Sequence, residues 1–469
     1  MSANTGIVTH GGATHEVNQY YDSVVVQLPG TGHTKTTKYC FLSRVDPWVD
    51  DPATANTESE NNPPTPSLSQ QSIKQTYKNM FVIKRVYPQD MRPMIDRIDW
   101  TSGVVYDYYR DDVDMVARDE NGHMVLKHYV KNRFDQVFKC LWNNSTVANP
   151  NGVPATDEPY FQPGALSPTN VYFGSDGYKW VYMYTIDASQ KQKFLDRSWM
   201  PTPLANTAGI EANTVNSGNI LVINVVDGGS NYFAVNTSVS IVGPCSNVAL
   251  ATPIVQNGVI SDIIVSDPGS NYISANVIIS SPTGNGAIAI APVSPVGGHG
   301  SDPFEEFGTS HIMVTNTFTK EESGYVPTSI NYRQIGFIIN PVAHSSYPYQ
   351  CEKPIYSCTT DLITSTGYGT YVTDEIVYQG DTLETATFKA TVLSFDATNN
   401  VLKLINITGT PVTNKSVIGV TSKTLRTVLN YNEPDFIPYS GYITYIENRT
   451  GTQRSSDGTE QVRLVVGFN

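Results

Sequence analysis

The chain is poor in charge, poor in cysteine and without a long apolar run. Only 16% of its 469 residues are charged, and 30 basic side chains stand against 43 acidic ones, for a formal net charge of −13. A surface of that sign repels phosphate backbones and anionic lipid, which argues against nucleic acid or membrane as a partner. No apolar run reaches the ~18 residues of a membrane helix, and Met1 to Gly12 lacks a signal sequence. We expect a soluble protein made in the cytosol.

The cysteines are few and scattered: Cys40, Cys140, Cys245, Cys351 and Cys358. An odd, dispersed set suits neither a disulfide framework nor a zinc site built from paired CxxC elements. We therefore expect all of these thiols to be reduced. Cys351 and Cys358 alone are close enough in sequence to bridge, and two free thiols in a loop is the favoured interpretation.

Motifs for catalysis are also missing. Gly30 to Thr36 resembles a phosphate-binding loop, but Thr34 stands where that loop needs a glycine before its lysine. Neither a Gly-x-Ser-x-Gly elbow nor an HExxH helix occurs, so a serine nucleophile and a zinc hydrolase both lack a candidate. The carboxylate pairs Asp157-Glu158 and Glu305-Glu306 could serve a glycosidase only at the right separation across a cleft. We predict no enzymatic activity, no cofactor and no metal site.

Strand signals dominate what is present. Apolar and aromatic residues alternate with polar ones over short runs bounded by Gly, Pro, Asn and Asp, which predicts a mainly β fold with few helices. Buried strands are predicted at Lys179 to Ile186 and Tyr332 to Asn340, and a closing strand at Gln461 to Phe468. Strands at Val113 to Arg118 and Met124 to Tyr129 should form a hairpin, because the intervening Asn-Gly can take the positive φ angles of a tight turn.

Two further features bear on interaction. Asp50 to Gln71 is rich in Pro, Ser, Thr and Asn, which predicts an extended exposed loop, either mobile or laid as a strap over a partner. The chain also has 28 tyrosines and 5 tryptophans, side chains that suit protein interfaces and sugar stacking alike. For any one of these residues, packing within the β framework is the simpler interpretation.

Two stretches differ in sequence pattern from the rest of the chain. Within Ser217 to Ala291, the segment Val226 to Tyr232 recurs 40 residues further on as Ser266 to Tyr272, which predicts a compact all-β insert whose two copies contact each other. In each copy a tyrosine follows a glycine-containing turn and can lie over it. The second stretch, Asp374 to Ser422, has short strands separated by polar turns and predicts a small barrel or sandwich.

The remaining aromatic framework resembles the baseplate wedge subunit of contractile-tailed bacteriophages, the "gene product eight" type of the large myoviruses. The resemblance covers roughly residues 14–203, 302–341 and 431–468. It is carried, in this order, by Phe41–Trp48 (FLSRVDPW), Asp99-Trp100, Asp176–Tyr182 (DGYKWVY), Tyr332–Pro341 (YRQIGFIINP) and Gly441–Arg449 (GYITYIENR). The two inserted stretches fall outside it.

The resemblance implies a β-sandwich framework with short peripheral helices, interrupted by two small all-β modules. The expected divisions are framework at 1–205, the duplicated module at 206–300, framework at 301–368, the barrel-like module at 369–430 and framework strands at 431–469. The signature residues are expected to be architectural, with the indoles packed in the framework and the aspartates before them accepting backbone amides: Asp46, Pro47, Trp48, Asp99, Trp100, Asp176, Gly177, Tyr178, Trp180, Arg333, Asn340, Pro341, Glu447 and Asn448.

The function implied by the resemblance is structural. A family member has no enzymatic activity, forms a homodimer, binds other wedge proteins of the virion's tail baseplate and rearranges with them when the sheath contracts. Two alternatives from other classes stay open. The inserted modules could make this a receptor-binding or fibre-anchoring tail protein that contacts host glycans, or an acidic cleft could make it a glycan-degrading tail enzyme.

Overall fold

The structure is a computed structural model that describes residues 10–25, 36–49, 59–162, 171–205, 217–320, 322, 324–328, 330–344, 350–454 and 458–468. Strands predominate and the helices are short, so the predicted mainly β fold is confirmed. The chain divides into two compact units, unit 1 from Met1–Tyr20, Arg92–Met313 and Val465–Asn469, and unit 2 from Tyr21–Met91 and Val314–Leu464. Elements α1 (His10–Val25), β3 (Met91–Asp96), β15 (His311–Thr319) and β25 (Thr459–Gly467) contain the points where the chain passes between units.

Unit 1 is built on an antiparallel sheet with the strand order β4, β5, β7, β6. The strands are β4 (Tyr129–Lys131), β5 (Gln136–Asn143), β6 (Val171–Phe173) and β7 (Tyr178–Thr185), and β8 (Trp199–Pro201) pairs separately with β3. Alternate residues of β7 enter different clusters, Trp180 an aromatic one and Val181 an aliphatic one, so both faces of the sheet are covered. Helix α3 (Ala188–Phe194) begins after Asp187, which accepts the Gln190 amide, and α4 (Pro303–Glu306) is a single turn.

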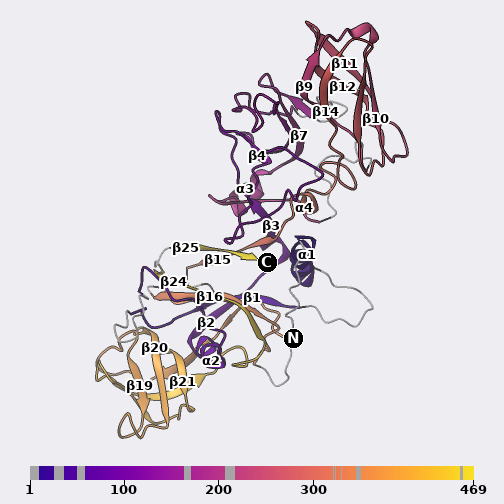
Figure 1. Cartoon of the computed structure of the whole chain (residues 1–469). Coiled ribbons are helices and arrows are strands. Elements are labelled where there is room, and N and C mark those ends of the chain that lie inside the picture. Colours follow the sequence, from indigo (N-terminus) through magenta and orange to yellow (C-terminus); the bar gives the residue numbers. More distant parts are fainter. Residues whose placement is uncertain are drawn as a thin grey trace, which may run out of the picture. The chain divides into compact units, whose positions relative to one another are not determined.

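The duplicated insert of unit 1 is a small β module, as predicted (Figure 1). Its elements are β9 (Asn224–Ser230), η3 (Ala234–Asn236), β10 (Ser238–Val242), β11 (Leu250–Gln256), β12 (Val259–Asp267), β13 (Asn276–Ser280) and β14 (Asn285–Ile290). Among the described residues they pair as β9 with β14, β10 with β13 and β11 with β12. Because β9 to β11 belong to the first copy and β12 to β14 to the second, every one of these pairings joins the two copies.

The repeated turns of the insert also bind across the copies. Tyr272 lies over the turn that contains Gly269 and accepts the Ala249 amide at 2.8 Å, while Tyr232 accepts the Ala287 amide at 3.2 Å. Gly269 has φ +63°, and a Cβ there would lie 2.6 Å from the Asn247 carbonyl oxygen. Only glycine therefore allows the tyrosine ring and the opposite strand to close on this turn.

Unit 2 contains a five-stranded sheet of order β17, β2, β1, β16, β24. Its elements are β1 (Lys38–Ser43), α2 (Gln70–Asn79), β2 (Met80–Arg85), η1 (Pro88–Asp90), β16 (Asn331–Ile339), β17 (Ile355–Ser357) and β24 (Tyr442–Gln453). β1 is buried along its whole length, and its Phe41 lies opposite Gly336 of β16. A Cβ on Gly336 would meet the Tyr445 carbonyl oxygen at 2.1 Å and the Phe41 ring at 2.5 Å, so the sheet requires glycine there.

The second inserted stretch is a closed antiparallel barrel in unit 2 (Figure 1). Its strands are β18 (Thr360–Thr364), β19 (Ile376–Gln379), β20 (Phe388–Asp396), β21 (Val401–Thr408), β22 (Ser416–Gly419) and β23 (Leu425–Asn432). β18 pairs with both β21 and β23 and closes the barrel, although it precedes the expected boundary at 369. The barrel interior is filled by side chains such as Leu362, Phe388 and Leu404, which are wholly buried.

The predicted strands at 179–186, 332–340 and 461–468 correspond to β7, β16 and β25 and are confirmed. The predicted turn at Asn121-Gly122 is present, with Gly122 at φ +81°, but the two predicted strands that flank it are wrong. The chain turns there, but the flanks share one isolated bridge, between Arg118 and Met124. Backbone bonds cross the turn from Asp119 to His123 and from Val125 to Ala117, at 2.8 and 2.9 Å. The Asp119 carboxylate accepts the amides of Asn121 and His123, each at 2.9 Å, so the His123 amide is bonded to a side chain.

Candidate functional site

Some signature residues of unit 2 lie around the edge formed by β16 and β24, namely Trp48, Arg333, Glu447 and Asn448. Asp46 and Pro47 are exposed, and among the described residues no hydrogen bond to the Asp46 carboxylate supports its predicted role as an acceptor of backbone amides. Glu60, from the proline-rich segment, accepts Arg333 Nε at 2.7 Å and the Gly451 amide at 2.8 Å. It also accepts the Trp48 amide at 3.1 Å, and the Trp48 indole donates to the Arg449 carbonyl at 2.8 Å. Although burial acts to raise the pKa of Glu60, the bonds from Gly451 and Arg333 lower it. This network, the Glu60 network, fixes the segment Val45 to Trp48 onto the sheet.

The neighbouring signature residues extend the same contact. Asn448 accepts Gln334 Nε2 at 2.8 Å and donates to the Pro64 carbonyl at 2.9 Å, so the prolines lie against this chain's own β24. Glu447 accepts the Tyr445 hydroxyl at 3.0 Å. Of the predicted extended loop, residues 50–58 lie outside the described residues, and helix α2 begins at Gln70, inside the range predicted to be loop.

Asn340 and Pro341 lie at the opposite end of β16. Asn340 has φ +50°, its side chain accepts the Thr37 amide at 2.9 Å, and its own amide donates to the Thr37 carbonyl at 2.8 Å. The Pro341 carbonyl accepts the Cys351 amide at 2.8 Å. These bonds terminate the β1 and β16 pair, which is an architectural role. All five cysteines are free thiols, including Cys351 and Cys358.

The signature residues of unit 1 surround an aromatic cluster. Asp176 accepts the amides of Thr156 and Asp157 at 2.7 and 2.9 Å, and Gly177 follows it with φ +83°. The Tyr178 and Trp180 rings stack at a centroid distance of 5.3 Å with 9° between their planes. The carboxylate therefore orders the loop beneath a buried aromatic pair.

Asp99 and Trp100 depart from the expected role. Instead of accepting backbone amides, the Asp99 carboxylate pairs with Arg97 at 2.8 Å and Lys131 at 3.2 Å. Although burial acts to raise the pKa of Asp99, these two cations lower it. Lys131 stands beside Asp99 because the Trp100 amide donates to the Lys131 carbonyl at 2.8 Å. Trp100 is partly buried against the aromatic cluster.

Three of the four carboxylates considered for a glycosidase bind other groups of the chain, namely Asp157, Glu158 and Glu306. Asp157 accepts the Tyr172 hydroxyl at 2.8 Å, and Glu158 pairs with Arg133. Glu306 is buried and binds Lys139 Nζ at 2.7 Å and His299 Nδ1 at 2.6 Å, while Glu305 does not share those partners. Burial acts to raise the pKa of Glu306, but Lys139 and His299 outweigh it and lower the pKa to about 2. A carboxyl group held this way is an anchor rather than a proton donor.

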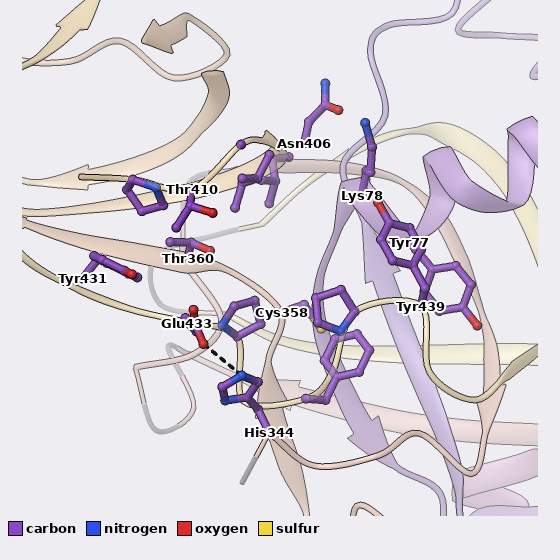
Figure 2. Close-up of a pocket in the computed structure, with 17 residues that line it drawn as sticks. Tyr77, Lys78, His344, Cys358, Thr360, Asn406, Thr410, Tyr431, Glu433 and Tyr439 are labelled. Atoms are coloured by element: carbon purple, nitrogen blue, oxygen red, sulfur yellow. Dashed lines mark ion pairs between the residues drawn. The ribbon is translucent and has the colours of Figure 1, made fainter. Parts of the chain in front are cut away.

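The candidate binding site is a groove of about 310 Å³ in unit 2, the Tyr77 groove (Figure 2). Helix α2 contributes Tyr77 and Lys78, and the loop before β24 contributes Tyr439. Figure 2 shows Thr360, Thr410 and Tyr431 of the barrel region across from this tyrosine pair. The remaining lining residues are His344, Cys358, Ile405, Asn406, Ile407, Gly409, Pro411, Glu433, Pro434, Phe436 and Pro438.

The groove has an aromatic wall and an ion pair at its base. The rings of Tyr77 and Tyr439 lie 5.6 Å apart at 58°, and the Tyr77 hydroxyl donates to the Gly441 carbonyl at 3.1 Å. Burial raises the pKa of Tyr77 to about 12, so its hydroxyl stays protonated at neutral pH. His344 Nε2 and the Glu433 carboxylate lie 2.9 Å apart, as the dashed line in Figure 2 marks. The groove thus combines apolar faces with fixed polar groups.

No known family model matches this chain, and no curated protein is similar to it. In the described part of the chain, no group of three or more His, Cys, Asp or Glu side chains is placed to hold a metal ion. No described helix is long and apolar enough to cross a membrane. The geometry of the molecule itself therefore carries the functional argument.

Sequence reasoning missed the groove, Glu60 and the Lys139, Glu306 and His299 cluster. Lys139 and Glu306 are 167 positions apart, and Glu60 and Arg333 are 273 apart, so no local spacing connects them. The groove could not be predicted for the same reason, because its lining residues come from α2, the barrel and the loop before β24. The Pro434 to Tyr439 segment, dense in proline and aromatic residues, was the one local signal available.

Proposed function

We propose that this chain is a structural subunit of a contractile phage tail, a baseplate wedge protein that takes part in assembly of the plate and in its rearrangement when the sheath contracts. The observation that carries the proposal is the way the signature residues are used. Trp48, Arg333 and Asn448 come from three distant segments and belong to one connected region around β16 and β24. That residues of the resemblance share one region of contacts supports the proposal of a common framework.

A mechanical role also agrees with how charge is used in the molecule. Glu306 holds two partners in the interior, and Glu60 ties two segments to a sheet, so these carboxylates rigidify the chain. We further propose a homodimer that binds other wedge proteins in the virion, having assembled in the host cytoplasm. Light scattering on a size-exclusion column should give twice the 51.4 kDa of one chain, and a monomer at micromolar concentration would count against the dimer.

Electron microscopy of immunogold-labelled virions tests the location. Antibodies raised against the purified chain should label the tail tip of particles produced from the genome that encodes it, before and after sheath contraction. Label on the capsid, or particles that carry none of the chain, would refute the proposal. Antibodies against a capsid protein of the same particles serve as the control for access.

A second candidate function is a receptor-binding or fibre-anchoring tail protein. The observation that favours it is the open tyrosine-lined groove beside the barrel, where Tyr439 is 50% exposed. Label confined to fibres or their attachment points, with none on the plate, would favour this candidate. Both roles can be held by one subunit.

A further inference from the structure

We propose that the Tyr77 groove binds a neutral sugar, one or two rings of a surface glycan. The inference rests on the second candidate function and gives it a site and a ligand class. A groove of about 310 Å³ lies at the lower end of the range for small-molecule sites. Its aromatic wall is preset, because Tyr77 is held by its bond to Gly441 and packs against Tyr439.

Polar groups without internal partners gather around the same groove. Among the described residues, the side chains of Thr360, Asn406, Thr410 and Tyr431 make no hydrogen bond to the rest of the chain, yet all four line it. Hydroxyl and amide groups both donate and accept, as sugar hydroxyls do. A tyrosine face beside such groups offers an apolar surface for the C–H face of a sugar ring and hydrogen bonds for its rim.

Backbone strain is concentrated at two lining residues. Tyr439 has φ +65°, a value that bulky side chains rarely adopt, and Asn406 has φ +51°. Asn406 and Ile407 together oppose Ala390 of β20, so Asn406 sits in a β-bulge that interrupts the barrel ladder. Bulges and strained residues re-aim side chains and occur preferentially at binding sites.

A sugar fits this chemistry better than a proline-rich peptide. Prolyl residues lack an N–H donor, so such a peptide would leave the acceptor capacity of the four partnerless side chains unused. The described lining also contains no cluster of like charges that would select a charged ligand. Glu433 and His344 are already paired, and Lys78 is the other charged residue that lines it.

Saturation-transfer NMR on the full chain tests the proposal, with glucose, galactose and N-acetylglucosamine and their β-linked disaccharides as probes. We expect at least one probe to bind with a dissociation constant at or below about 10 mM. Tyr439→Ala should weaken binding about tenfold through loss of the aromatic face, whereas Tyr439→Phe should retain it. Asn406→Gly, which suits the positive φ and removes the amide, should also weaken binding.

Tyr368→Ala is the matched control, because Tyr368 is 98% exposed and does not line the groove. It should leave affinity unchanged. The proposal is overturned if no probe binds, if Tyr439→Ala and Tyr368→Ala bind alike, or if a synthetic proline-rich peptide binds where the sugars do not. Loss of sugar binding with gold label still at the tail tip would refute this site and leave the architectural role intact.

Discussion

The duplicated insert and the barrel are both small β modules, but their strands are paired differently. The barrel closes its ladder on itself, and its interior residues Phe388 and Leu404 are wholly buried. The insert joins its two copies through strand pairs and leaves Leu250 and Ile288 at 58% and 52% exposure. Both modules enclose a buried apolar cluster, and the barrel also leaves apolar side chains exposed, with Leu425 at 55%. The difference lies in the strand edges, which closure removes from the barrel and which the open pairs of the insert keep.

The insert is anchored in the core of unit 1 at both of its flanks. The insert enters the core of unit 1 through Val222, which is buried in the aliphatic cluster, and through Asn224, which donates to the Leu141 carbonyl at 3.0 Å. Its other flank supplies His299 to the buried Glu306. The boundary of the insert is therefore set by these anchors rather than by the bounds of the repeat.

The largest effect on folding should come from where the insert is cut out of the chain. Removing residues 206–300, the bounds expected from the sequence, and joining Ala205 to Ser301 takes away Val222 and His299, so we expect unit 1 to misfold. Removing residues 226–288 and joining Val225 to Ala289 through Asn-Gly should leave it folded, because these two residues are strand partners. Soluble yield and tryptophan fluorescence in a urea titration distinguish the two. Equal behaviour of both deletions would show that the anchors are dispensable.

The next largest effect should come from truncating a buried side chain of the barrel, compared with an exposed one of the insert. Phe388→Ala in the barrel should lower the free energy of unfolding by about 3 to 5 kcal/mol, since it leaves a cavity at a wholly buried position. Leu250→Ala on the insert should change it by no more than about 0.5 kcal/mol. Calorimetry of both variants measures the difference. A large loss for Leu250→Ala would instead place that side chain in an interface, including the proposed dimer.

As the pH is lowered, unit 1 should lose stability at a higher pH than the barrel does. Burial and the nearby Lys139 lower the pKa of His128 from 6.5 to about 3, so the unfolded chain binds a proton that the folded chain does not. The stability from neutral His128 is therefore full above pH 6.5 and is lost as the pH falls toward 3. No histidine lies between Thr360 and Asn432, so the barrel lacks this effect.

Thermal unfolding at pH 7 and pH 4.5, followed by tryptophan fluorescence, measures this loss. Fluorescence is suitable because the insert and the barrel contain no tryptophan, and Trp100, Trp142, Trp180 and Trp199 all belong to unit 1. His128→Leu should reduce the difference between the two pH values. An unchanged pH dependence in that variant would assign the acid sensitivity to other groups.

The smallest effect should test the symmetry within the insert. Tyr232→Phe and Tyr272→Phe each remove the acceptor of one backbone amide, of Ala287 and Ala249 respectively, at a cost of about 1 to 3 kcal/mol. Hydrogen exchange of the opposite strand should quicken in both variants to a similar extent. If only one of the two variants exchanged faster, the two copies would not contribute equally to the stability of the insert.

The sequence alone determined the features whose physics is local. Alternation of apolar residues predicted β7 and β16, because side chains of a strand point to opposite faces in turn. The duplicated turn predicted a module with cross-contacting copies, because Gly269 and its following tyrosine set the turn within a few residues. The wrong flanks of the hairpin show the limit of such reasoning, since the Asp119 side chain takes the His123 amide next to the turn.

Only the tertiary structure decided the rest. Glu306 is an anchor because folding surrounds it with Lys139 and His299, and nothing beside it in the chain distinguishes it from an exposed carboxylate. β18 closes the barrel from outside the expected module, and the Tyr77 groove exists only where α2 and the barrel region come together. Burial, ion pairing and cavity shape depend on partners far along the chain, which periodicity and local spacing do not specify.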